Sequence, residues 1–393
     1  MDMAVVGVIS GTSFDAVDTA AARFSMDSSK ITMHLLGTGS TPLAADLRAR
    51  LASCLPPSAT TVEEICKLDT ELGQLFGAAA KRQVDALPAE TAVDLVVSHG
   101  QTVFHWVDPD GHALGTLQLG QPAWIAEATG LPVISDLRAR DIARGGQGAP
   151  LASTLDALLL FHDDVRRGSL NLGGIANITV RSQSGAIVAY DIGPANGLMD
   201  SVIADVTNGA LRMDANGEMA ACGAVDRSLL TDLLAEPYYR LPPPKSTGKE
   251  LFNTEYVRAF LDGRSVCADD LLATLAELTA QLVADACHDH QLEELVVAGG
   301  GTLNPVLMAR ITDLCAPAAV TAIDAYGIPA QAKEACLFAL LGYLSMHGLD
   351  GTIPSATGAS RGSILGSLTP GSSPLRLPEP VTVAPSRLNV LRQ

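Results

Sequence analysis

Near its start the chain reads Ala4-Val5-Val6-Gly7-Val8-Ile9-Ser10-Gly11-Thr12-Ser13-Phe14-Asp15-Ala16-Val17-Asp18, an apolar run that enters a turn of small polar residues. A second apolar run follows at residues 19–24, so the pattern predicts two strands joined by a glycine turn. Gly11 lets the backbone approach a ligand closely. The loop N–H groups and the Thr12 and Ser13 hydroxyls can bind phosphate oxygens. Asp15 and Asp18 can hold a hydrated Mg²⁺ beside that phosphate. Taken alone, the loop is equally consistent with a plain hairpin turn.

The opening pattern returns in the middle of the chain. Residues 169–190 again predict three strands, and the first of their turns reads Asn171-Leu172-Gly173-Gly174-Ile175-Ala176-Asn177. A third glycine run, Gly299-Gly300-Gly301, follows an apolar strand at 294–298, and Asn304 before Pro305 is expected to cap the next helix. The three loops predict an α/β fold with duplicated βββαβα units, in which two lobes face each other across a cleft and bind ligands at their strand ends. The sequence has no GxxxxGK[ST] motif, which excludes a P-loop.

Composition narrows the functional classes. The chain has 393 residues, of which 47% are hydrophobic, and this length favours two domains. A net charge of -17 and the absence of a basic run argue against nucleic-acid binding. Seven cysteines without a CxxC pair indicate a reducing compartment. The longest apolar segment, 335–344, is too short to cross a membrane, so a cytoplasmic protein is expected.

Breaks in the pattern also give expected domain limits. The first lobe is expected to comprise residues 1–137 with about 348–368, and the second residues 138–347. The glycine-rich stretch 145–150 is interpreted as a hinge. Residues 369–393 carry Pro, Ser and Gly and are expected to form a loosely attached tail.

Asp191 is the strongest candidate for catalysis. It ends a predicted strand beside Gly193 and Pro194, where its carboxylate can act as a general base on a water or a sugar hydroxyl. A carboxylate that merely caps the turn is an equally good interpretation from position alone. The segment 245–250 follows three prolines and is expected to be an exposed loop that either shields the cleft or connects domains.

A second group of polar residues could bind a sugar. His99 and Gln101 follow a strand that is expected to end at residue 98, and they can bind hydroxyls or a carboxylate; a satisfied polar turn is the alternative. Arg138 either belongs to a salt network between the domains or binds an anion, since arginine can grip a carboxylate at two points. Glu334 opens the last long helix and either faces the cleft or is a solvated residue of the first turn.

Taken together, these motifs resemble those of the anhydro-N-acetylmuramic acid kinases, in the sugar kinase–actin–Hsp70 ATPase superfamily. The matching segments occur in order from about Val6 to Gly366 and include GVISGTSFDAVD, HGQTVFH, DLRARDIARGGQGAPL, NLGGIANIT, DIGPANGLMD, PKSTGKELFN, AGGGTLNPVLMARI, GIPAQAKEA and SATGAS. The resemblance implies a two-lobed, actin-like ATPase fold with ATP in the cleft.

The resemblance also implies an activity and a set of roles. The family enzyme opens the 1,6-anhydro bond of anhydro-N-acetylmuramic acid and phosphorylates O6, using ATP, Mg²⁺ and water. By this resemblance Asp191 is the catalytic base, His99, Gln101, Arg138 and Glu334 bind the sugar, and Asp15 and Asp18 are the metal candidates. ATP would be bound by Gly11, Thr12, Ser13, Phe14, Asp15, Ala16, Val17, Asp18, Gly173, Gly174, Asn177, Gly299, Gly300, Gly301 and Asn304. A homodimer and a role in cell-wall recycling are implied as well.

Three residues depart from the family pattern. Ala16 and Ala195 stand where the family has glycine, and Ile192 stands where it has threonine. A glycine with positive φ would make an alanine there strained. These departures leave two alternative functions open. One is a kinase for another 1,6-anhydro sugar, such as levoglucosan, and the other is a catalytically impaired nucleotide-binding regulator.

Overall fold

The computed structural model describes residues 2–11, 14–56, 58–243, 245–248 and 251–391. The chain forms two compact units, of which unit 1 comprises Met1–His162 with Ala332–Gln393 and unit 2 comprises Asp163–Gln331. The sequence analysis expected the limits after residues 137 and 347. Residues 138–162 and 332–347 belong to unit 1 because their helices pack on its sheet and its last strand.

Unit 1 contains an eight-stranded sheet. Along the sheet the order is β12-β6-β4-β1-β2-β3-β13, and β5 pairs with β4. Every residue of the central strand β1 is buried, as expected for an apolar strand covered on both faces. The strands are β1 (Met3–Ser10), β2 (Ala16–Asp27), β3 (Lys30–Pro42), β4 (Leu95–Val107), β5 (Ala113–Leu119), β6 (Val133–Ser135), β12 (Ser367–Thr369) and β13 (Arg387–Leu391).

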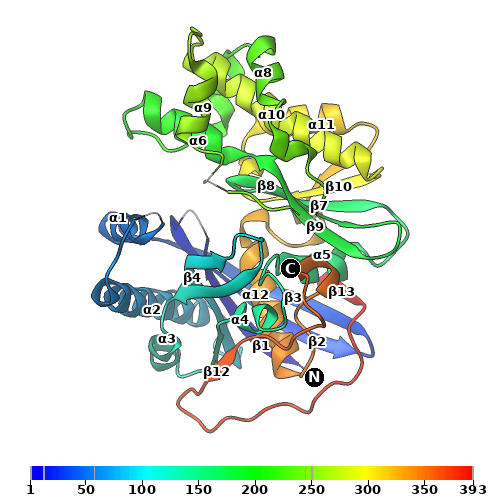
Figure 1. The fold of residues 1–393 in the computed structure, drawn as a ribbon. Coiled ribbons are helices and arrows are strands. Elements are labelled where there is room, and N and C mark those ends of the chain that lie inside the picture. The colour runs from blue at the N-terminus through cyan, green and yellow to red at the C-terminus, as the bar shows by residue number, and fades with distance from the viewer. Residues whose placement is uncertain (1, 12–13, 57, 244, 249–250, 392–393) are drawn as a thin grey trace. The chain divides into compact units, whose positions relative to one another are not determined.

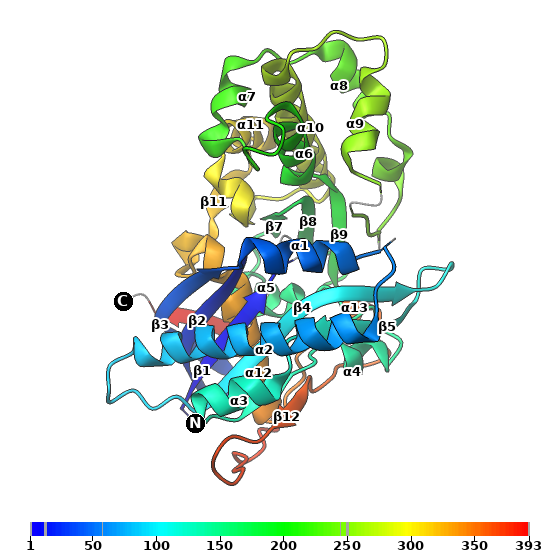
Figure 2. The ribbon, with the colours of Figure 1, turned by 90° about the vertical axis from the view of Figure 1, so that its left-hand side faces the viewer.

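Helices cover both faces of this sheet. On one face α2 and α3 lie side by side (Figure 2), over a core that includes Val6 and Val8. On the other face α12 approaches β1 so closely that a Cβ on Gly7 would lie 2.0 Å from the Ala335 carbonyl oxygen (Figure 1). The helices are α1 (Ala45–Cys54), α2 (Val62–Asp85), α3 (Pro122–Thr129), α4 (Ala139–Ile142), α5 (Ala152–Leu160), α12 (Lys333–Met346) and α13 (Pro354–Thr357).

Unit 2 repeats this plan with a five-stranded sheet in the order β11-β10-β7-β8-β9. Its antiparallel trio β7-β8-β9 matches β1-β2-β3, and its parallel strands β10 and β11 match β4 and β6. The predicted α/β class and the duplicated strand order are therefore confirmed. The strands are β7 (Arg167–Leu172), β8 (Ile175–Arg181), β9 (Ile187–Pro194), β10 (Glu294–Ala298) and β11 (Ala319–Ala322).

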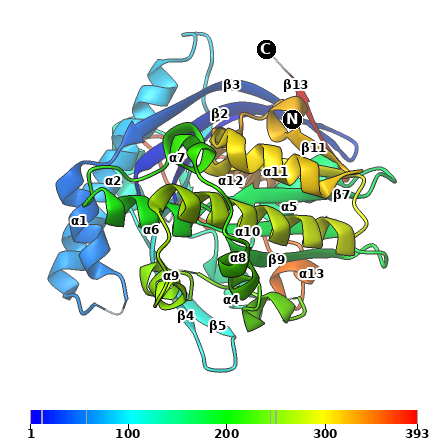
Figure 3. The same ribbon diagram turned by 90° about the horizontal axis from the view of Figure 1, so that it is seen from above.

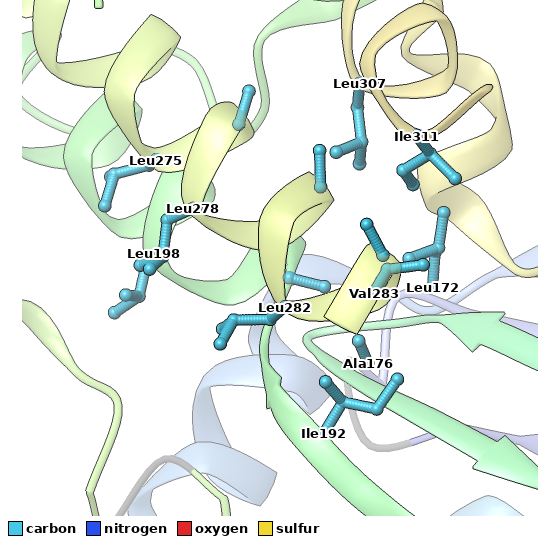
Figure 4. Packing of buried hydrophobic residues seen from close by; sticks show 14 of the residues in the cluster. Leu172, Ala176, Ile192, Leu198, Leu275, Leu278, Leu282, Val283, Leu307 and Ile311 are labelled. Carbon is cyan, nitrogen blue, oxygen red and sulfur yellow. The ribbon is translucent and has the colours of Figure 1, made fainter. Parts of the chain in front are cut away.

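The helices of unit 2 share one apolar core with its sheet. Figure 3 shows α10 and α11 side by side, and Figure 4 shows their leucines packed with residues of β7, β8 and β9. The α-helices are α6 (Asn196–Val206), α7 (Glu218–Cys222), α8 (Arg227–Leu233), α9 (Thr254–Leu261), α10 (Ala268–Asp289) and α11 (Pro305–Cys315). Short 3-10 helices span Ala215–Gly217, Pro237–Arg240, Gly300–Leu303, Ile323–Tyr326 and Ala330–Ala332.

Three segments differ from the sequence-based expectation. The strand expected to end at residue 98 continues as β4 to Val107, because β5 pairs with its second half. The stretch 145–150 is part of unit 1, where the buried Asp141 accepts hydrogen bonds from the Gly148 N–H and the Thr357 hydroxyl, 2.9 Å each. In the expected tail, residues 387–391 form β13, which pairs in parallel with β3. Among the described residues, no helix has the length and apolar character needed to span a bilayer.

Candidate functional site

The first glycine loop joins β1 to β2, and a side chain of the neighbouring strand β4 is hydrogen-bonded to it. The buried Gln101 side chain donates from Nε2 to the Gly11 carbonyl oxygen at 3.2 Å, and Ser10 lies opposite Gln101 in the strand register. The Phe14 N–H donates to the same carbonyl oxygen at 3.0 Å, and Phe14 has φ 39°. Thr12 and Ser13 lie outside the described residues. Gln101 thus supports the loop from within the fold.

Two carboxylates stand at the beginning of β2. Asp15 is exposed and Asp18 is half-buried. Burial raises the pKa of the Asp18 carboxyl, the nearby charge of Asp15 raises it further, and a hydrogen bond with Ser40 opposes both. A cation would relieve this repulsion, and carboxylate oxygens are ligands that suit Mg²⁺. Val17 between them is fully buried and belongs to the core of unit 1.

His99 and Arg138 form a buried hydrogen-bonded pair. Arg138 donates from Nε to His99 Nε2 at 2.9 Å and from Nη1 to the Gly148 carbonyl oxygen at 2.7 Å. The other ring nitrogen of His99, Nδ1, lies 2.9 Å from the Gly100 carbonyl oxygen. Because Nε2 accepts from Arg138, the ring is neutral and its proton is on Nδ1. Burial and the Arg138 charge both lower the pKa of His99 well below its usual value. Both ring nitrogens are therefore engaged within the protein.

Glu334 stands in the first turn of α12 with an exposed side chain. Its Oε2 lies 4.0 Å from the place where a Cβ on Gly11 would be, so the carboxylate is next to the first glycine loop. Desolvation by the surrounding protein raises the pKa of the Glu334 carboxyl, and the charges of Arg138 and Lys333 oppose this shift. Unit 1 thus brings together the glycine loop, Arg138 and Glu334.

In unit 2 three polar residues are aligned across the ends of the antiparallel strands. Asn171 of β7 lies opposite Asn177 of β8, which in turn lies opposite Asp191 of β9. Directly opposed residues point to the same face of a sheet, so the three side chains form a row. Sequence reasoning singled out Asn177 and Asp191, but it did not assign Asn171 to the site.

The second and third glycine loops meet beside this row. Gly174 accepts at its carbonyl oxygen from the N–H groups of Ala195 and Gly197, both at 3.0 Å, at the beginning of α6. A Cβ on Gly299, which has φ 90°, would lie 2.7 Å from Asn171 Oδ1. The loops of β7 and β10 are therefore packed against one another, and a bulkier residue than glycine would not fit at Gly299.

Asn304 begins the helix after the third loop, as predicted. Its Oδ1 accepts from the N–H groups of Val306 and Leu307, each at 3.1 Å, and Pro305 occupies the first helical position. This cap satisfies backbone donors that the helix itself cannot pair. Because Asn304 is buried and its Oδ1 is used by the cap, its contribution to the site is structural.

Asp191 is contacted by the segment after the prolines. The Ser246 hydroxyl donates to Asp191 Oδ2 at 2.8 Å, and the Thr247 N–H donates to the same oxygen at 3.0 Å. The expected exposed loop thus reaches the candidate base, within unit 2. Sequence reasoning missed these two donors. The run of small polar residues at 246–248, directly after the prolines, was the available signal.

None of the three departures from the family pattern has a positive φ. Ala16 is the first residue of β2, and Ala195 has φ -128°, so neither alanine lies in the left-handed region. Ile192 is 4% exposed and packs in the apolar core with Ala176 and Leu282 (Figure 4). Threonine at 192 would place its hydroxyl in that core.

The duplicated sheet, with glycine loops and carboxylates at its strand ends, agrees with the sugar-kinase fold expected from the sequence. The family model for anhydro-N-acetylmuramic acid kinase matches residues 3–371. The chain is 52% identical over 390 residues to the anhydro-N-acetylmuramic acid kinase of Streptomyces coelicolor, with 99% of each chain covered. It is 37% identical over 368 residues to that of Coxiella burnetii, covering 92% of this chain and 96% of the relative. The chain belongs to the anhydro-N-acetylmuramic acid kinase family.

Solved structures of other proteins show a more distant similarity to this chain. An ADPNP-bound activator of 2-hydroxyisocaproyl-CoA dehydratase from Clostridium difficile aligns with a TM-score of 0.41 and 11% identity, covering 86% of this chain and 93% of that one.

Proposed function

We propose that this protein is an ATP-dependent kinase that hydrolytically opens the 1,6-anhydro ring of anhydro-N-acetylmuramic acid and phosphorylates O6. The product is N-acetylmuramic acid 6-phosphate. The observation that carries the proposal is Asp191, a carboxylate held within β9, which continues past the expected end to Pro194, in a chain 52% identical to a kinase of this name. Two residues were behind the alternative of another anhydro sugar, Ile192 and Ala195. Both are buried in the core of unit 2 and give that alternative no support.

The reaction needs a base that activates water, a leaving group at the anomeric carbon, and an oxygen that accepts the γ-phosphoryl group. Asp191 takes a proton from water, and the water oxygen forms a bond to the anomeric carbon. The bond from that carbon to O6 breaks, and its electron pair stays on O6. O6 then takes the γ-phosphoryl group, and ADP leaves. Most of the rate enhancement would come from positioning and from charge stabilisation on the phosphate.

We assign the remaining residues to three tasks. Backbone N–H groups around Gly11 and Gly173–Gly174 would bind phosphates, and Gly299–Gly301 would lie against the adenosine. Arg138 and Glu334 would contact the sugar. His99 would act through Arg138, because both of its ring nitrogens are already bonded. Gln101 would act through the Gly11 loop in the same way.

Asp15 and Asp18 fit the Mg²⁺ that the proposed reaction requires. Burial raises the pKa of Asp18, the nearby charge of Asp15 raises it further, and a cation bound there would oppose both effects. Bound there, the ion would offset charge on the triphosphate. Replacing each residue by Asn should weaken Mg²⁺-dependent ATP binding, and calorimetry with and without Mg²⁺ would measure this.

The family resemblance further supports a cytoplasmic homodimer with a role in cell-wall recycling. Light scattering on the purified protein would test the oligomeric state.

A coupled ADP-release assay with and without the anhydro sugar tests the main proposal. Sugar-dependent ADP release together with a 6-phosphosugar is expected. ATP binding without sugar-stimulated release would instead support a nucleotide-binding regulator. A panel that includes levoglucosan, compared by kcat/KM, tests the choice of sugar.

A further inference from the structure

One segment of unit 2 holds the candidate base in place. We call residues 245–247 the strap. The Asp191 N–H donates to the Lys245 carbonyl oxygen at 3.1 Å, so the strap is joined by its backbone to β9. This bond fixes which residues of the strap face the Asp191 side chain.

The next two strap residues bind the carboxylate itself. The Ser246 hydroxyl and the Thr247 N–H both donate to Oδ2 of Asp191, at 2.8 Å and 3.0 Å. Hydrogen bonds to a charged acceptor are stronger than neutral ones. Two donors on one oxygen restrict rotation of the carboxylate about the Cβ–Cγ bond of Asp191. A general base is effective only when its lone pair is directed at the proton it removes.

The strap has an anchor that does not involve the carboxylate. Lys245 donates from Nζ to the carbonyl oxygens of Tyr238 and Tyr239, at 3.3 Å and 2.9 Å. The same ammonium lies 4.9 Å from the centre of the Tyr238 ring. The Tyr238 hydroxyl in turn donates to the Asp191 carbonyl oxygen at 2.8 Å. These contacts hold the donors of the strap independently of the Asp191 carboxylate.

We infer that Ser246 and Thr247 are positioning residues that orient the Asp191 carboxylate for proton removal from water, and that Lys245 anchors them. This inference rests on the proposed function. The strap itself touches the base and is not assigned to the sugar or the nucleotide. Its loss should therefore slow the chemical step and leave substrate binding unchanged.

Ser246→Ala is the direct test, measured by steady-state ADP release at varied sugar and ATP. We expect kcat to fall about ten-fold or more, with KM for the sugar and for ATP within about two-fold of the parental values. Ser246→Thr restores a hydroxyl and should recover most of kcat. Ser184→Ala is the matched control, because the Ser184 hydroxyl bonds to Ser182 in an exposed turn of the same unit.

Lys245→Met gives a second, independent test of the inference. It keeps the length of the side chain and removes the ammonium donors, so kcat should fall while both KM values stay close to parental. An unchanged kcat in both Ser246→Ala and Lys245→Met would overturn the inference, as would a fall that Ser246→Thr does not reverse. The parental enzyme separates the two proposals: without sugar-dependent turnover, the proposed function fails and the inference fails with it.

Discussion

Arg138 donates a hydrogen bond from Nε to Nε2 of His99 over 2.9 Å, and this bond fixes the protonation state of a buried histidine. A protonated His99 would have no acceptor at Nε2 and would place a second positive charge against the guanidinium. Burial also disfavours the imidazolium. Arg138 is therefore held by a neutral ring, and acid should disrupt this arrangement.

The protein should lose stability as the pH falls below about 6.5, in part because of His99. In the unfolded chain this histidine takes up a proton near its ordinary pKa of 6.5, whereas in the folded protein its pKa is well below that value. The unfolded state then binds more protons, so the free energy of unfolding decreases as the pH falls through this range. Thermal unfolding between about pH 7 and pH 5.5 would measure the slope.

His99→Gln provides the comparison. Glutamine keeps an acceptor for Arg138 and does not titrate, so the variant should lose less stability on acidification than the parental protein. The lowered pKa values of His105 and His290 leave some pH dependence in both proteins. Identical slopes for parent and variant would show that His99 does not contribute.

Local features were predictable from the sequence, and contacts between distant segments were not. Asn304 caps its helix as the pattern indicates, because a cap depends on residues that are neighbours in the chain. The duplicated strand order could also be predicted, since each unit repeats its own turns. The bond between Arg138 and His99 joins positions 39 residues apart, and that between Ser246 and Asp191 spans 55. Such contacts depend on how strands and loops pack.

The continuation of β4 beyond residue 98 shows the same limit of prediction from local sequence. The polar residues at 99–101 suggested a turn, yet they lie in a strand because β5 pairs beside them. His99 accepts a hydrogen bond from Arg138, and Gln101 donates one to the Gly11 carbonyl oxygen, and no local pattern reveals these partners.

Asp191→Asn should abolish turnover and leave ATP binding intact. Asparagine retains an oxygen acceptor for the Ser246 hydroxyl and the Thr247 N–H, but it cannot take a proton from water. General-base catalysis contributes about 10²–10⁴-fold, so kcat should fall by at least that order. Calorimetry with a non-hydrolysable ATP analogue would show whether the nucleotide still binds. A variant with near-parental kcat would remove Asp191 from its proposed role.

Gly299→Ala should destabilise the protein, whereas Gly300→Ala should not. Gly299 has φ 90°, and a Cβ there would lie 2.7 Å from Asn171 Oδ1 and 2.8 Å from the Leu172 carbonyl oxygen. Backbone strain of this kind costs about 1–3 kcal/mol before the steric clash is added. A Cβ on Gly300 has no heavy atom within 4 Å in the described part of the chain.

Urea unfolding of the Gly299→Ala and Gly300→Ala variants would measure the difference in their stability. Equal midpoints for the two variants would mean that the packing between the second and third glycine loops is not tight.

Asp156 of α5 and Lys333 of α12 form a buried ion pair next to the site, with Oδ1 and Nζ 2.7 Å apart and exposures of 2% and 6%. Removing one member of a buried pair leaves the other charge in a medium that solvates it poorly, which typically costs about 3–5 kcal/mol. Asp156→Ala should therefore lower the free energy of unfolding by that amount. Because Lys333 precedes Glu334, sugar binding should weaken as well.

Asp205→Ala is the matched control for Asp156→Ala. Asp205 pairs with Arg258 at 3.0 Å, but both side chains are 52% exposed. Water and salt screen exposed pairs, so this substitution should change stability by less than about 1 kcal/mol. Urea unfolding of both variants gives the difference directly. If Asp156→Ala proved as mild as Asp205→Ala, Lys333 would have to be stabilised by its other contacts, and the pair would not be what fixes the beginning of α12.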